Sequence, residues 1–205
     1  EKGAMHIVTY GRQNATLARR PTSRYNGRRS GKRGKTVTLD GITLGAIVRE
    51  LARLNGAKIE KVHQPAQAEL RLLLHTQEGR KRLLISAAGG DSRLHLTESQ
   101  RENPAKAPNF CMLLRKYIAG GRILEIKQIG LERVVRIEIE AKDEMGVPTA
   151  FALVCEIMGK YSNILLLGRE DRVMGAIRPI SLDTSRVRPL AAGMRYELLP
   201  MDKHN

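Results

Sequence analysis

The side chains best suited to catalysis or metal binding are few and scattered in this chain of 205 residues. Both cysteines lie inside apolar runs, which is typical of buried free thiols. The histidines show no spacing typical of zinc ligands. There is also no Walker-type phosphate loop and no nucleophile elbow. The residues concerned are Cys111, Cys155, His6, His63, His75, His95 and His204. The sequence therefore predicts no catalytic residue, no metal site and no cofactor.

The basic side chains are more informative, because the formal net charge is +15. Residues 1–37 contain ten lysines and arginines and one glutamate, so they carry +9 and leave +6 for the rest of the chain. They have no periodic apolar positions, and we predict either a disordered basic leader or a non-native extension. The basic excess on the remaining body favours a polyanionic partner.

Hydrophobic residues make up 41% of the chain, which is enough for the core of one domain. No apolar run approaches the roughly 18 residues that a membrane helix needs. The first residues also lack the apolar centre of a secretory signal. We therefore expect a cytoplasmic protein without a membrane partner.

Hydrophobic periodicity predicts two main amphipathic helices. In the first, Leu44, Val48 and Leu51 share one face after Asp40, and Asn55-Gly56 forms the end. The second is expected at residues 109–119. Alternating or apolar runs bounded by turns predict about nine strands, mostly joined as hairpins. These are residues 58–63, 69–76, 80–87, 93–96, 122–129, 133–141, 149–158, 163–167 and 173–177.

These elements indicate an α+β fold made mostly of antiparallel β-sheet, not a doubly wound parallel sheet. The folded domain is expected to span residues 38–200. Residues 201–205 are interpreted as a truncated end within a larger protein.

Several stretches, in a fixed order, resemble the N-terminal domain of the NFACT family, the ribosome-quality-control family that includes RqcH and NEMF. Residues 108–116 and 156–164 are the longest and most specific of them. The complete set is residues 39–41, 61–65, 86–97, 103–104, 108–116, 120–121, 130–133 and 156–164. The resemblance implies a fold similar to the N-terminal domain of formamidopyrimidine DNA glycosylases.

The resemblance also implies a function. Proteins of this family bind a stalled large ribosomal subunit that still holds a peptidyl-tRNA. They recruit a tRNA, in bacteria alanyl-tRNA, and support untemplated alanine tailing of the nascent chain. On this basis the domain is expected to be an RNA-binding module and not a self-contained enzyme.

The residues that the family links to tRNA are an early aspartate and a later Asp-Arg pair. They map onto Asp40, Glu132 and Arg133, and Glu132 departs from the family aspartate by one methylene. A carboxylate can accept hydrogen bonds from base amino groups or a ribose hydroxyl, whereas it would repel phosphate. Arg133 could contact phosphate or stack on a base. Asp40 could equally cap its helix, and Glu132 and Arg133 could be a solvated pair at a strand end.

Further candidate RNA contacts are basic or polar residues inside the same family-like stretches. Each has a structural alternative: solvation, a helix C-terminus, the outer face of a strand or a tight turn. These candidates are Arg93, His95, Arg115, Lys116 and Lys160.

Two other functions stay open at this stage. Relatives often carry fibronectin-binding names, which would suggest a surface adhesin, although the chain shows no signal, anchor, repeat or disulfide pattern. The implied glycosylase-like fold would suggest a DNA glycosylase, but such enzymes use an amino-terminal proline that does not precede the first helix here.

Overall fold

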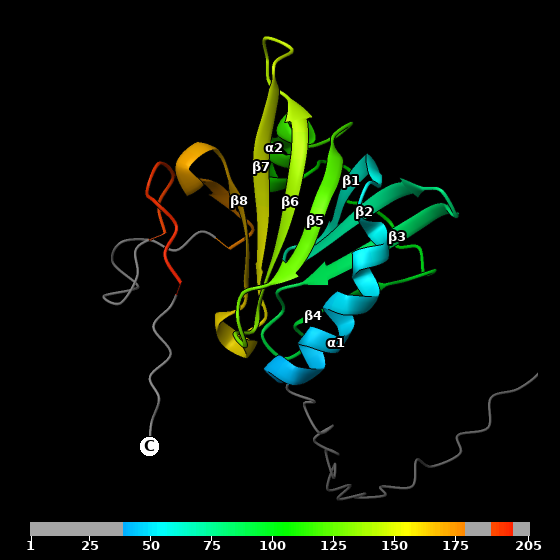
Figure 1. Ribbon diagram of the computed structural model, residues 1–205, viewed down its shortest axis with the longest axis vertical. Coiled ribbons are helices and arrows are strands. Elements are labelled where there is room, and N and C mark those ends of the chain that lie inside the picture. The colour runs from blue at the N-terminus through cyan, green and yellow to red at the C-terminus, as the bar shows by residue number, and fades with distance from the viewer. Residues whose placement is uncertain (1–38, 179–189, 199–205) are drawn as a thin grey trace, which may run out of the picture. The chain divides into compact units, whose positions relative to one another are not determined.

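The computed structural model describes residues 39–178 and 190–198, which form one nine-stranded sheet with two α-helices (Figure 1). This confirms the prediction of an α+β fold that is mostly antiparallel. The predicted leader at residues 1–37 and the predicted truncated end at residues 201–205 lie outside the described residues.

Helix α1 (Gly41–Leu51) is extended by a short 3₁₀ turn, η1 (Ala52–Leu54). Its start is fixed by Asp40, whose Oδ1 accepts a hydrogen bond from the Thr43 N–H at 2.7 Å. Its apolar face is buried, as the spacing predicts. The chain then turns at Gly56, where φ is +85°, a conformation that suits glycine.

Helix α2 (Asn109–Tyr117) is two residues shorter than predicted. The φ of Ile118 opens to −119°, and Gly120 adopts φ +82°, so the chain leaves the helix there. Phe110, Cys111 and Leu114 form its buried face. Cys111 and Cys155 are both buried free thiols, which confirms their interpretation. Burial raises the pKa of both thiols, so neither is a ready nucleophile.

The sheet has the strand order β4-β3-β2-β1-β5-β6-β7-β8-β9, and every neighbouring pair is antiparallel. Short 3₁₀ turns, η2 (Gly159–Tyr161) and η3 (Arg169–Asp171), flank β8. The strands are β1 (Lys58–Ala66), β2 (Glu69–Thr76), β3 (Gly79–Ser86), β4 (Arg93–Leu96), β5 (Arg122–Gln128), β6 (Val134–Lys142), β7 (Pro148–Glu156), β8 (Asn163–Leu167) and β9 (Val173–Ala176).

Several predicted strand boundaries differ from the observed ones by one or two residues, and the largest difference is at the end of β1. The first strand was expected to stop at His63 because Pro65 lacks an N–H, but β1 continues to Ala66. Its ladder with β2 is irregular between His63 and Ala66, so the proline falls where the regular pairing is interrupted.

Strands β1 and β5 are paired only between Lys58 and Arg122. Beyond this junction the two halves of the sheet diverge (Figure 1). Helix α1 contacts both β4 and β5, and α2 contacts β1 and β9. The helices and the inner faces of both halves share one hydrophobic core, and the other face of β1–β4 is covered in part by residues 97–103.

Candidate nucleic-acid interface

The N-terminus of α1 is joined to the β5–β6 turn by the side chain of Gln128, the last residue of β5. Its Nε2 donates to the Gly41 carbonyl and to the Glu132 carbonyl, each at 2.8 Å. The two carbonyl oxygens therefore lie within twice that distance of each other. Asp40 precedes one and Arg133 follows the other, so the fold brings these predicted residues to one place.

Two glycines of α1 allow this close approach. A Cβ on Gly41 would lie 2.2 Å from the Leu131 carbonyl oxygen, and a Cβ on Gly45 would lie 2.8 Å from Gln128 Oε1. The first contact is with backbone, which cannot rotate away. The α1–turn junction, meaning Asp40, Gly41, Gln128 and residues 130–133, thus depends on small residues in the first turns of the helix.

Asp40 is exposed and also caps α1. Hydrogen bonds from the Thr43 N–H, the Thr43 hydroxyl and the Ile42 N–H lower the pKa of its carboxyl group, the first being the largest effect. The group is therefore ionised at neutral pH. Capping and RNA contact are compatible, because the carboxylate is accessible at its solvent side.

Glu132 and Arg133 are half-buried. The Oε2 atom of Glu132 is enclosed and has no hydrogen-bond partner within the described residues. The Arg133 carbonyl accepts from the Ile157 N–H at 2.8 Å. In the described part of the chain its guanidinium makes no hydrogen bond or ion pair, so its donors are available to a ligand.

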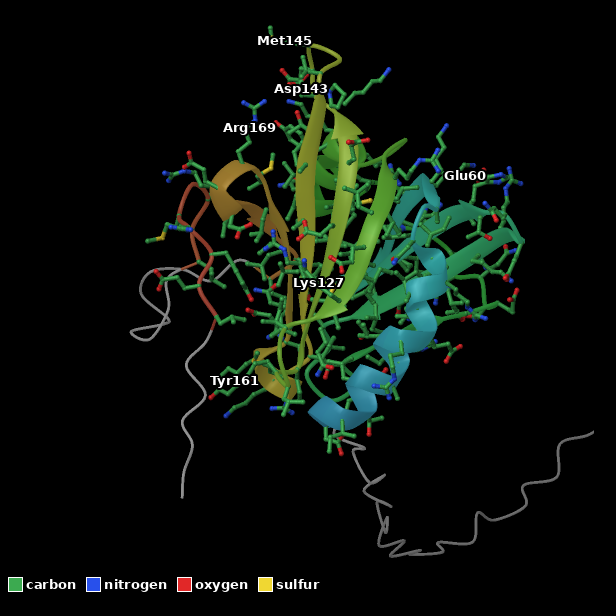
Figure 2. The ribbon with its side chains drawn as sticks, viewed as in Figure 1. Glu60, Lys127, Asp143, Met145, Tyr161 and Arg169 are labelled. Carbon is green, nitrogen blue, oxygen red and sulfur yellow. The ribbon has the colours of Figure 1, made fainter. Side chains whose placement is uncertain are left out.

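Lys160 lies at the same end of the sheet, in the β7–β8 connection (Figure 2 labels its neighbour Tyr161). Its Nζ sits 4.9 Å from the centre of the Tyr161 ring. The Arg178 guanidinium donates to the carbonyls of Lys160 (3.2 Å), Ser162 (3.3 Å) and Ala87 (3.3 Å). It thereby ties this connection to the β3–β4 loop.

Arg93 and His95 lie on the outer face of β4, on either side of the buried Leu94, as the alternation predicts. Arg93 Nε is 3.2 Å from His95 Nε2, and its guanidinium pairs with Asp91. Leu94 faces the core that contains α1. The side chains of these two residues therefore lie on the face of β4 opposite that of Leu94.

Arg115 and Lys116, in the last turn of α2, make their contacts outside the α1–turn junction. Arg115 Nε donates to the Val62 carbonyl at 3.0 Å. Lys116 pairs with Glu144 in the β6–β7 hairpin, at the far end of β6 from Arg133. Nine strand residues at roughly 3.3 Å each separate those ends by about 30 Å. Lys116 therefore cannot share one nucleotide contact with Asp40, while the Arg115 side chain is bound to the backbone of β1.

Sequence reasoning missed Gln128 and the exposed apolar side chains of Ile42 and Leu131 at this end. Ile42 is 80% exposed and Leu131 81%, and Tyr161, beside Lys160, is 65% exposed. Ile42 is the residue after Gly41, and Leu131 is the residue whose carbonyl lies against Gly41. The only available signal was their position: an apolar residue next to a cap, and another inside a Gly-Leu-Glu-Arg turn. The surface around Asp40 is thus part acidic, part basic and part apolar.

No group of three or more potential metal ligands occurs within residues 39–178 and 190–198. Among those same residues, no helix is both long and apolar enough to span a membrane.

The chain belongs to the NFACT family. The family model for NFACT N-terminal and middle domains matches residues 40–205. The chain is 35% identical to the Rqc2 homolog RqcH of Bacillus subtilis over 80% of its length, and 36% identical to that of Streptococcus suis over 82%. It spans 29% and 31% of those two relatives.

Solved structures agree with this membership. The N-terminal domain of fibronectin-binding protein PavA from Streptococcus pneumoniae matches with a TM-score of 0.76 and 36% identity. This match covers 79% of the present chain and 62% of that structure. The N-terminal part of the fibronectin/fibrinogen-binding protein from Streptococcus suis matches with a TM-score of 0.75 and 35% identity, over 78% and 61% of the two chains.

Proposed function

We propose that this chain is an RNA-binding module of a ribosome-quality-control factor, and that its α1–turn junction contacts tRNA. The single observation that carries this proposal is the bridge from Gln128 to the carbonyls of Gly41 and Glu132, the residues next to Asp40 and Arg133 in the chain. The names of more distant relatives, which are ribosome quality control complex subunits of Schizosaccharomyces pombe and Mus musculus, support the ribosome-quality-control role.

The chemistry of the junction favours recognition of bases or ribose over simple charge attraction. An ionised Asp40 repels phosphate but accepts hydrogen bonds from base amino groups or a 2′-hydroxyl. Arg133 has donors available for a forked contact or a stacking interaction. Glu132 belongs to the same junction, and its enclosed Oε2 has no hydrogen-bond partner among the described residues.

In the full-length factor this module would help to hold a tRNA on a large subunit that carries a peptidyl-tRNA. The tRNA recruited would support untemplated alanine tailing. The module would have no active site of its own and would work in the cytoplasm. A fold similar to that of glycosylase N-terminal domains remains part of this proposal.

The test is tRNA binding by the purified chain, measured by fluorescence anisotropy at several salt concentrations. Asp40→Asn keeps a capping side chain but removes the charge, and Arg133→Gln removes the guanidinium. Each should weaken binding about tenfold or more, since hydrogen bonds to charged groups contribute about 1.5–3 kcal/mol. Arg169→Gln is the matched control, because Arg169 is exposed and lies at the other end of the molecule (Figure 2). Equal affinities in all three variants would refute the site.

A fibronectin-binding adhesin is the second candidate, favoured by the names of the structural neighbours. Immobilised fibronectin would then bind the chain, and Asp40→Asn would have no effect on that binding. A glycosylase-like activity has no specific support in the described residues, and an abasic-site cleavage assay would detect it.

A further inference from the structure

A second polar site lies on the outer face of β1–β3, away from the α1–turn junction. Leu70, Leu72 and Leu74 of β2 are fully buried in the core, so Arg71 and Leu73 face outward. His63 pairs with Arg71 across the sheet, and Leu73 pairs with Arg82. These side chains form the floor of a cavity of about 120 Å³.

The wall of this cavity is the stretch from Thr97 to Asn103, here called the crossing segment. Arg71 donates to the Ser99 carbonyl at 2.8 Å, and Arg82 donates to the carbonyls of Glu98 (3.2 Å) and Ser99 (3.3 Å). The Asn103 amide lies 3.1 Å from His63 Nδ1. His63 and Asn103 belong to family-like stretches that the α1–turn junction does not use.

The charges around the cavity are unbalanced. Arg71, Arg82 and Arg101 line it. One carboxylate, Glu69, accepts from Arg71 and from Arg101, each at 2.7 Å. Arg82 contacts only carbonyl oxygens, so its charge has no acidic partner among the described residues. Glu98 and Glu102 are exposed and do not line the cavity.

The pKa of His63 is lowered from its ordinary value. Partial burial lowers its pKa most, and Arg115, Lys61 and Arg82 lower it further. The imidazole is therefore neutral at pH 7 and offers one donor and one acceptor. The excess positive charge of the cavity therefore comes from its guanidinium groups, and His63 contributes hydrogen-bonding capacity.

The size of the cavity selects the kind of anion. A water needs roughly 10–15 Å³ of such space, while small-molecule pockets begin at roughly 300 Å³. About 120 Å³ therefore suits a group of a few heavy atoms and excludes a whole nucleotide. Guanidinium groups match phosphate oxygens with paired N–H donors.

From these observations we infer that the cavity between Arg82, Arg101, His63 and Asn103 binds a phosphate group, supplied by an RNA backbone. The RNA source rests on the proposed function, whereas phosphate binding does not. Free phosphate shares the same chemistry, so the two sources need separate measurements. The cavity would position RNA by its backbone, while the α1–turn junction contacts bases or sugar.

The first experiment titrates the chain with inorganic phosphate and follows the His63 imidazole resonance by NMR. Arg82→Gln should weaken phosphate binding at least tenfold. Arg80→Gln should change it less than twofold; Arg80 is the matched control because it faces outward on the same strand but pairs with Glu60 at 2.9 Å. Arg82→Lys keeps a cation without the fork and should lose about threefold, which guards against a misfolded glutamine variant. Equal phosphate affinity in the Arg82 and Arg80 variants would overturn the site.

The second experiment measures tRNA binding against salt. Arg82→Gln should lower the slope of log K against log salt by about 1 relative to Arg80→Gln, because one phosphate contact is lost. An unchanged slope would overturn RNA as the source, even if phosphate binding were lost. If Asp40→Asn and Arg133→Gln left tRNA affinity unchanged while Arg82→Gln reduced the slope, the proposed function at the junction would fail and this inference would stand.

Discussion

The α1–turn junction and the cavity on β1–β3 hold polar groups in different ways. At the junction, a neutral amide from Gln128 binds two carbonyl oxygens, and close backbone contact at Gly41 sets the geometry. At the cavity, arginines bind one carboxylate and the carbonyls of the crossing segment. The junction keeps an acidic group exposed, whereas the cavity has an excess of positive charge. If both proposals hold, the junction contacts bases or ribose and the cavity contacts the phosphate backbone.

The largest expected effect comes from Gly41→Ala, which should disrupt the α1–turn junction and leave the cavity on β1–β3 unchanged. Its new Cβ would lie 2.2 Å from the Leu131 carbonyl oxygen, so the turn or the helix must move. The free energy of unfolding should fall by about 1–3 kcal/mol, as in other overpacked sites, and tRNA affinity should fall with it. Chemical denaturation and anisotropy would measure the two effects.

Gly90→Ala is the control for that variant, since a Cβ there meets nothing within 4 Å and its φ is not positive. Phosphate binding at the cavity should be unchanged in both glycine variants. A Gly41→Ala protein as stable as Gly90→Ala would contradict the close approach.

Gln128→Leu should have the next largest effect. It removes the donor that serves the carbonyls of Gly41 and Glu132, and leaves these groups to find water or remain unpaired. We expect a loss of stability of about 1–3 kcal/mol and weaker tRNA binding with an unchanged salt slope. Loss of phosphate binding in this variant would show that the two regions are coupled, against this account.

The smallest effect concerns pH. Hydrogen bonds from Thr43 lower the pKa of Asp40 in the folded chain, compared with about 3.9 in an unfolded one. The carboxylate therefore stabilises the fold above that unfolded value, and this contribution is lost as pH falls through the folded pKa. The midpoint temperature of thermal unfolding, measured from pH 5 down to pH 2.5, should fall less steeply for Asp40→Asn than for the parent. An equal pH dependence in the two proteins would show that ionisation of Asp40 does not contribute to stability.

Much of the fold could be predicted because the buried side chains of helices and strands recur at regular intervals in the sequence. The helical spacing of Leu44, Val48 and Leu51 and the alternation of Val135, Ile137 and Ile139 both match buried positions. The extension of β1 past Pro65 could not be predicted, because it depends on an irregular pairing with β2 that has no local signal.

The site was predictable only in part. The resemblance to the NFACT family marked Asp40, Glu132 and Arg133, but not the side chain that joins them. Gln128 looks like an ordinary polar residue at a strand end until the fold places Gly41 beside it. Likewise, the separation of Lys116 from Arg133 follows from the length of β6 and its hairpin, which local sequence does not relate to α2.

The most direct measurement is a double-mutant cycle on tRNA affinity with Asp40→Asn, Arg133→Gln and the combined variant. Groups that engage the same part of one ligand are coupled, whereas distant independent groups are additive. The account predicts that the combined variant loses at least threefold less affinity than the product of the two single losses. Losses that multiply fully, or single variants that bind tRNA as the parent does, would contradict a shared contact at the α1–turn junction.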